Sequence, residues 1–185
     1  GAVTVKGFIP PIIFMEFLAR RVLPIAVDMR TLEHVTYTPA PDIIHEAAGH
    51  APMIANTDYA DYLCAYGKVA KKAIQSKHDS ELYKLIRKMS DMKEDPNVSK
   101  VELKNIELEL ENKSSESHWT SEANELARMN WWTIEYGLVG DINNPKIYGA
   151  GLLSSVSESL DCLDKKVKKI PISIECIHQD YNITE

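Results

Sequence analysis

The segment TPAPDIIHEAAGH, residues 38–50, places two histidines five residues apart, with Glu46 directly after the first. On a regular α-helix, residues four apart lie above one another, whereas residues five apart are rotated by roughly 140°. His45 and His50 therefore cannot reach one metal ion from the middle of a regular helix, as the two histidines of the H-E-x-x-H zinc-protease signature can. They can do so if His45 lies in the first turn, where the backbone is not yet committed to the helix.

The residues around the two histidines favour that arrangement. Pro39 and Pro41 disfavour helix before them and force an extended approach. Asp42 then stands where an N-cap belongs, which places the first histidine in the first turn. Gly49 leaves room beside the second histidine for a neighbouring group. The alternative interpretation is a pair of hydrogen-bonded core histidines, so a metal site needs a third ligand.

Glu135 is the candidate for the third ligand. It lies in NWWTIEYGL, residues 130–138, among aromatic and aliphatic side chains. Burying an unpaired carboxylate is costly, so a cation should satisfy it unless Glu135 lies on the polar face of its helix. Two histidines and one carboxylate with open positions form the facial triad of non-haem Fe(II) oxygenases, although the ligand types alone also allow zinc.

Composition narrows the class of protein. The chain has 185 residues, of which 44% are apolar and 26% charged, and this predicts one ordinary folded domain with its own core. The net charge of −6 does not favour a nucleic-acid or membrane surface, and no apolar run is long enough to cross a bilayer. Cys64, Cys162 and Cys176 lie far apart in no C-x-x-C pattern, which predicts reduced thiols and a cytoplasmic protein.

Helical patterns cover most of the chain. The expected helices are 14–25, one from Asp42 through the histidines, 57–75 and 120–140. Residues 72–118 are rich in charge and poor in aromatics, which predicts a helical hairpin on the surface, broken near Pro96. A regulatory or partner-binding insertion is the alternative interpretation of this segment. Residues 168–184 alternate between apolar and polar as one or two strands would.

Several motifs, taken in order, resemble one family. YTPAPDIIHEAAGHAPM, WWTIEYGL and YGAGLLSS, with the weaker FLARRVLPIAVDMR and IHQDYNITE, resemble the pterin-dependent aromatic amino acid hydroxylases. The resemblance implies a mainly α-helical, basket-like catalytic domain with a few short strands, of the α+β class. It implies a single domain over residues 1–185, a truncated core of the family's catalytic domain, with the charged segment 72–118 as an insertion.

The resemblance also assigns roles to particular residues. The implied iron ligands are His45, His50 and Glu135. The residues that match the amino acid pocket are Arg30, Thr38, Pro41, Trp131, Gly151 and Ser154. The residues that match the pterin site are Gly7, Ile9, Phe14 and Glu46. Tyr181 matches a tyrosine near the iron, and Asp42 is expected to orient the His45 imidazole from behind. Without the resemblance, the sequence favours a surface ion pair for Arg30 and a purely structural place in the hydrophobic core for Trp131.

The implied reaction is hydroxylation of an aromatic amino acid ring, with Fe(II), O2 and tetrahydrobiopterin or another tetrahydropterin. Trp131, together with Ile183 where tyrosine hydroxylases carry an acid, favours phenylalanine converted to tyrosine, and hence a role in phenylalanine catabolism. The alternatives are tryptophan hydroxylation by the same chemistry, a zinc hydrolase with Glu46 as general base, and a folded non-catalytic binding domain. Pro10-Pro11 and Asn130 depart from the family's pattern.

Overall fold

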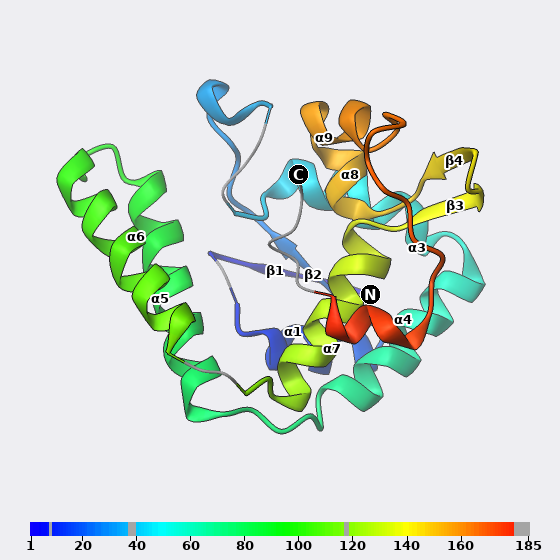
Figure 1. Cartoon of the computed structure of the whole chain (residues 1–185), viewed down its shortest axis with the longest axis horizontal. Helices are drawn as coiled ribbons and strands as arrows, with labels where there is room; N and C mark the ends of the chain where they lie inside the picture. Colours follow the sequence, from blue (N-terminus) through cyan, green and yellow to red (C-terminus); the bar gives the residue numbers. More distant parts are fainter. Residues whose placement is uncertain (8, 37–39, 117–118, 180–185) are drawn as a thin grey trace.

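The computed structural model describes residues 1–7, 9–36, 40–116 and 119–179. These residues form a mainly helical molecule with two small two-stranded sheets, which confirms the expected α+β class (Figure 1). The strands are β1 (Ala2–Val5), β2 (Leu23–Ala26), β3 (Leu138–Asp141) and β4 (Asn144–Ile147). The α-helices are α1 (Pro11–Ala19), α2 (Ile43–His45), α3 (Ala51–Ile54), α4 (Thr57–Ala70), α5 (Lys77–Glu94), α6 (Lys100–Ser115), α7 (Glu122–Asn130), α8 (Ala150–Ser154) and α9 (Val156–Asp161). The narrower or wider helical turns are η1 (Leu32–His34), η2 (Glu46–His50), η3 (Trp131–Glu135) and η4 (Ile174–His178).

The first helix differs from the expected span 14–25. It begins at Pro11, whose missing N–H and fixed φ suit the first helical position. It ends at Ala19 because Arg21 adopts a left-handed φ of 56°, and the Val22 N–H donates to the Phe17 carbonyl in a Schellman-type ending. The chain then turns into β2, which pairs in parallel with β1.

The core forms where α1 crosses α4 and meets the end of α7. Its buried members are Met15, Leu18, Leu23, Leu63, Tyr66, Ala70 and Ile134. The two helices approach closely at Gly67, where a Cβ atom would lie 2.7 Å from the Met15 carbonyl oxygen. Ile134 is 1% exposed and belongs to the same turn as Glu135, so core packing fixes the position of that carboxylate.

The charged segment forms the expected surface hairpin, made of α5 and α6, which stands to one side of the molecule (Figure 1). Both helices begin with a capping box, Ser76 with Asp79 and Ser99 with Glu102. In each box the serine hydroxyl accepts from the backbone N–H of the acidic residue, whose carboxylate accepts from the serine backbone N–H. Lys113 of α6 forms an ion pair with Glu81 of α5. The base of the hairpin is tied to α7, where the Ala123 N–H donates to the Ile74 carbonyl.

The strand prediction for 168–184 is wrong over the described residues of that segment, which end at 179. The chain there runs irregularly and then forms the narrow turn η4, with Ser173 as its N-cap. Ile170 and Ile172 remain 60% and 78% exposed, and the segment pairs with none of the four described strands. Alternation alone does not make a strand when no partner lies beside it. None of the helices in the described ranges combines the length and the apolar character needed to cross a bilayer.

Candidate metal centre

His45 and His50 face one another despite their five-residue spacing. As expected, Asp42 is the N-cap of α2, and its carboxylate accepts a hydrogen bond from the His45 N–H at 2.9 Å. The expectation that an uncommitted backbone at His45 brings the histidines together is wrong, because His45 has regular helical angles of −57° and −46°. The turn that follows, η2, is instead a π turn, which the Ala51 N–H closes onto the Glu46 carbonyl. A π turn holds one residue more than an α turn, so residues five apart come to lie above one another.

The third candidate ligand is presented by a second π turn. In η3 the Tyr136 N–H donates to the Trp131 carbonyl, five residues earlier, at 2.8 Å. Glu135 is the last residue of this turn, directly after the buried Ile134. His50 and Glu135 are therefore both directed toward the centre by a π turn, which adds one residue to a helix.

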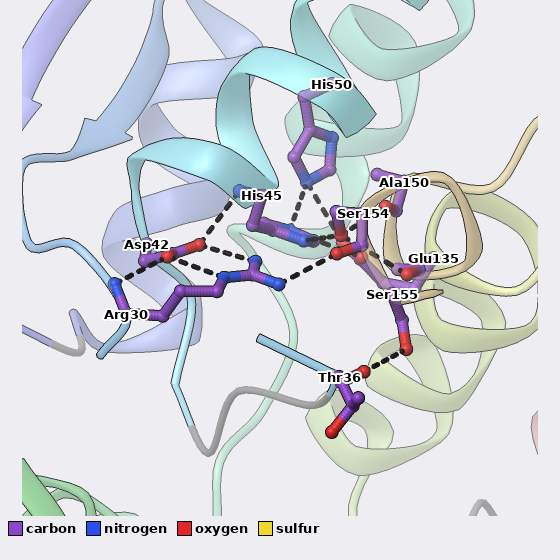
Figure 2. A network of polar contacts seen from close by, with 10 residues as sticks. Arg30, Thr36, Asp42, His45, His50, Glu135, Ala150, Ser154 and Ser155 are labelled. Atoms are coloured by element: carbon purple, nitrogen blue, oxygen red, sulfur yellow. Dashed lines mark hydrogen bonds and ion pairs between the residues drawn. The ribbon is translucent and has the colours of Figure 1, made fainter. Parts of the chain in front are cut away.

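The donor atoms of the three residues converge on one point (Figure 2). His45 Nε2 and His50 Nε2 are 3.1 Å apart. The distances to the Glu135 carboxylate are 3.2 Å from His50 Nε2 and 3.5 Å from His45 Nε2. Donors about 2.1 Å from one ion lie roughly 3.0 Å apart when they are adjacent on an octahedron. The spacing of the three donors therefore fits a single transition-metal ion bound on one face.

Burial and charge act differently on the three candidate ligands: burial opposes protonation of His50, but the Glu135 carboxylate raises the pKa of that imidazole, so a metal ion would displace a proton there. The exposed fractions of the side chains are 3% for His50, 12% for His45 and 15% for Glu135. Burial opposes ionisation of Glu135, but the two histidines and a hydrogen bond from the Gly151 N–H hold the pKa of its carboxyl below the usual value. Burial lowers the pKa of His45, which favours the neutral imidazole. An ionised carboxylate beside a neutral imidazole is the ligand state that binds a cation.

Ser154 fixes the orientation and tautomer of His45. Its hydroxyl donates to the Ala150 carbonyl at 2.8 Å and lies 2.8 Å from His45 Nδ1. A hydroxyl has a single proton to donate, so the imidazole must carry its proton on Nδ1 and donate it to Ser154. The lone pair on Nε2 then faces Glu135 and His50. The expected role of Asp42 is corrected in this respect, since it holds His45 through the backbone and Ser154 holds the ring.

Arg30 and Asp42 form a buried, bidentate ion pair at the start of α2 (Figure 2). Arg30 Nε donates to Asp42 Oδ2 at 2.8 Å and Nη2 donates to Oδ1 at 2.7 Å. Nη1 donates to the Ser154 carbonyl at 2.9 Å. Both side chains are 3% exposed, so the surface ion pair considered from sequence is wrong for Arg30. Three of the five guanidinium N–H groups are thus used, and the two that have no hydrogen bond among the described contacts could hold a substrate carboxylate.

Glu46 and Phe14 are the two predicted pterin-site residues that lie nearest the histidines in the sequence or in space. The Phe14 ring centroid is 6.3 Å from that of His50. Glu46 is 4% exposed, and its Oε2 has no hydrogen-bond partner among the described atoms. Burial raises the pKa of Glu46 to about 7. A buried carboxyl oxygen without a partner is suited to a ring that bears N–H groups, such as a pterin.

For the other residues predicted for the site, the structure records fewer contacts with the metal centre. Gly151 borders the centre, since a Cβ atom there would lie 3.5 Å from Glu135 Oε2. Trp131 starts η3 and packs on Tyr136, with ring centroids 4.6 Å apart. Pro41 is exposed directly before Asp42.

The loop expected to contact the pterin, which includes Gly7 and Ile9, already forms a hydrogen bond within the protein. Gly7 has a left-handed φ of 65°, and its N–H donates to Asp28 Oδ2 at 2.9 Å. Ile9 is half-buried. Thr38 and Tyr181 lie outside the described residues, so their predicted roles stay predictions.

Sequence reasoning missed Tyr59 as a neighbour of the site. Its hydroxyl is buried and has no hydrogen-bond partner among the described atoms, and its ring meets that of Tyr148 edge-on at 6.1 Å. Burial, and then the nearby Glu135 carboxylate, raise the pKa of the Tyr59 phenol. No motif pointed to this residue, because its position depends on how α4 packs against the turn before α8.

Gly149→Ala is expected to lower the free energy of unfolding by about 1–3 kcal/mol, the usual cost of overpacking a well-packed interior. A Cβ atom there would overlap the Glu135 carbonyl and lie 2.6 Å from the Gly137 nitrogen, which are backbone atoms that cannot turn aside. Urea unfolding checks the prediction, with Gly151→Ala as the matched control. At that position the nearest atom would be 3.1 Å away, and we expect a change below about 1 kcal/mol. Equal losses in both variants would contradict the role assigned to this contact.

The fold and the site define a helical protein with two histidines and one carboxylate gathered at a single centre. The family model for the biopterin-dependent aromatic amino acid hydroxylases matches residues 3–89 and 105–185, and the chain belongs to that family. Residues 90–104, which lie outside the match, form the tip of the α5–α6 hairpin.

Individual relatives agree with the family assignment. The chain is 33% identical over 164 residues to the phenylalanine-4-hydroxylase of Chromobacterium violaceum, covering 88% of this chain and 40% of that one. It is 30% identical to the Pseudomonas aeruginosa phenylalanine-4-hydroxylase, covering 98% and 48% of the two chains. The chain therefore spans less than half the length of these curated relatives.

Solved structures show the same fold. The C. violaceum phenylalanine hydroxylase with bound iron(III) and 7,8-dihydrobiopterin matches with a TM-score of 0.59 at 30% identity, over 89% of this chain and 44% of that one. The apo structure of the cold-active phenylalanine hydroxylase from Colwellia psychrerythraea 34H matches with a TM-score of 0.67 at 25% identity, over 100% of this chain and 54% of that one.

Proposed function

We propose that this chain is the catalytic core of an aromatic amino acid monooxygenase that converts phenylalanine to tyrosine with Fe(II), a tetrahydropterin and O2. The convergence of His45, His50 and Glu135 on one point is the observation that carries the proposal. The names of the relatives support the substrate, and the iron and dihydrobiopterin bound in the C. violaceum enzyme support the cofactors. We further propose that residues 1–185 form one catalytic domain with an insertion at 72–118, and that the protein is cytoplasmic, as its three free cysteines suggest.

Each group of residues would have a separate task. His45, His50 and Glu135 would hold the iron on one face and leave the opposite face open. Ser154 keeps the proton of His45 on Nδ1, so Nε2 stays available as a ligand. When bound, iron and tetrahydropterin supply the activation of O2 and the electrons for it, which protein side chains do not provide.

The amino acid would be held by Arg30 and the pterin by Phe14 and Glu46. The two unused N–H groups of Arg30 are suited to a carboxylate, and Asp42 keeps the guanidinium plane fixed. Phe14 offers a face for stacking and Glu46 an unpaired carboxyl oxygen for a ring N–H.

The test is a competition assay. The chain is given Fe(II), a tetrahydropterin, O2 and equal amounts of ring-13C phenylalanine, tryptophan and unlabelled tyrosine, and products are identified by mass spectrometry. We expect 13C-tyrosine as the main product. Hydroxytryptophan as the main product would change the assigned substrate to tryptophan, while the proposed type of reaction would stand. Absence of any oxygenated product from a chain that retains Fe(II) would contradict the proposal.

A further inference from the structure

An open cavity of about 630 Å³ separates the helical hairpin from the start of α1. One wall is a single face of α5, and the other includes Pro10 and Pro11. The cavity is distinct from the metal centre, because none of the three candidate ligands lines it. The hairpin tip, residues 90–104, lies outside the family match, and Asp91, Met92, Asp95 and Val98 from it line the cavity.

The α5 wall carries separated charges. Lys84, Arg87 and Lys88 project from neighbouring turns, and Asp91 and Asp95 follow nearer the end of the helix. Lys84 and Lys88 form no ion pair among the described residues, whereas other lysines of the hairpin, such as Lys113, do. The cavity therefore has a cationic end, where these two lysines have no ion pair among the described residues, and an acidic end that repels anions. This distribution suits a ligand with an anionic group directed toward Lys84 and Lys88.

The cavity adjoins the wall that the proposed function assigns to the pterin. Pro10 precedes Phe14 by four residues, so the two lie on the same side of the first turn of α1. Phe14 faces His50, and Pro10 lines the cavity. Gly7 makes a second link, since a Cβ atom there would lie 3.7 Å from Asp91 Oδ1. A pterin stacked on Phe14 could thus extend its side chain past Pro10 into the cavity.

We propose that the pterin used by this chain carries an anionic side chain, either carboxylate or phosphate, bound by Lys84 and Lys88 on α5. The inference rests on the proposed function and specifies its cofactor. Helix geometry separates the two anion types, because Lys88 lies roughly 4.5 Å and Lys84 roughly 10 Å along α5 from Asp91, next to Gly7. A short phosphate-bearing chain reaches Lys88, whereas an extended chain that ends in carboxylates reaches Lys84 as well.

Calorimetric binding to the Fe(II)-loaded chain without O2 tests the proposal independently of catalysis. The probes share a dihydropterin ring: 7,8-dihydrobiopterin with a neutral side chain, 7,8-dihydroneopterin 3′-phosphate, and 7,8-dihydrofolate with two carboxylates. We expect one anionic probe to bind about tenfold more tightly than dihydrobiopterin, with a preference that shrinks as salt is added. Loss through Lys88→Gln alone identifies the phosphate, and loss through either Lys84→Gln or Lys88→Gln identifies the carboxylates.

The double variant Lys84→Gln/Lys88→Gln should bring all three affinities within about twofold and leave that of dihydrobiopterin unchanged. Lys100→Gln/Lys104→Gln is the matched control, since it removes the same charge from exposed positions of α6 away from the cavity. Equal binding of the three pterins to the unaltered chain overturns the inference alone, as does a preference that survives the double variant. Failure of all three to bind overturns the pterin part of the proposed function as well.

Discussion

His50→Ala is expected to abolish tight Fe(II) binding, with a loss of affinity of more than about 100-fold. Even removal of a partner that only supports a metal ligand costs about 10–100-fold, and His50 supplies one of the three donor atoms itself. Without it, Glu135 and His45 are left to share an ion that each can hold only weakly. The measurement is anaerobic equilibrium dialysis against Fe(II), with the iron content determined per chain.

Two further variants make that result specific. His78→Ala removes a histidine from α5, away from the centre, and should leave iron binding unchanged. Glu135→Gln preserves the shape of the side chain and should weaken binding because the charge is lost. Retention of iron by both His50→Ala and Glu135→Gln, with the helical circular dichroism intact, would refute the assignment of the triad.

Asp42→Ala is expected to lower the free energy of unfolding by about 3–5 kcal/mol, the usual cost of removing one partner of a buried ion pair. The Arg30 guanidinium, 3% exposed, would be left without its counter-ion, and α2 would lose its N-cap. Urea unfolding of the metal-free chain measures this change without any contribution from iron binding.

The chain offers its own control for this second variant. Arg21 and Asp61 form another arginine–aspartate pair, whose side chains are 59% and 63% exposed. Asp61→Ala should therefore cost less than about 1 kcal/mol, because water screens the charges before and after the change. Similar losses for Asp42→Ala and Asp61→Ala would show that burial does not set the strength of the inner pair.

Local signals in the sequence predicted one half of the site well. Pro41 and Asp42 predicted where α2 begins, because a proline and an N-cap act on their immediate neighbours. The hydrophobic surroundings of Glu135 predicted that its carboxylate would need a partner, and the structure places two histidines beside it. Both inferences needed only the chemistry of residues close together in the chain.

The features that sequence reasoning missed depend on contacts between distant segments. The π turn that contains His50 is packed against α8, where a Cβ atom on Gly49 would lie 2.6 Å from the Ala150 carbonyl oxygen. The width of that turn is therefore set together with a segment about 100 residues away in the chain. The bond between Ser154 and His45 spans 109 residues. The alternation in 168–179 failed as a strand signal for the same reason, since a strand forms only where another segment of the fold lies beside it and pairs with it.

The two π turns have a consequence for how this protein can vary. An insertion inside a helix shifts the phase of everything that follows by about 100°, so the extra residue in η2 sets the direction of α3 as well as that of His50. The same holds for η3 and the hairpin of β3 and β4 behind it. Substitutions along these helices change one side chain at a time, whereas the loss of one residue from either turn would rotate a candidate ligand away from the centre and misdirect the chain beyond it. Length in these two stretches is therefore constrained more tightly than sequence.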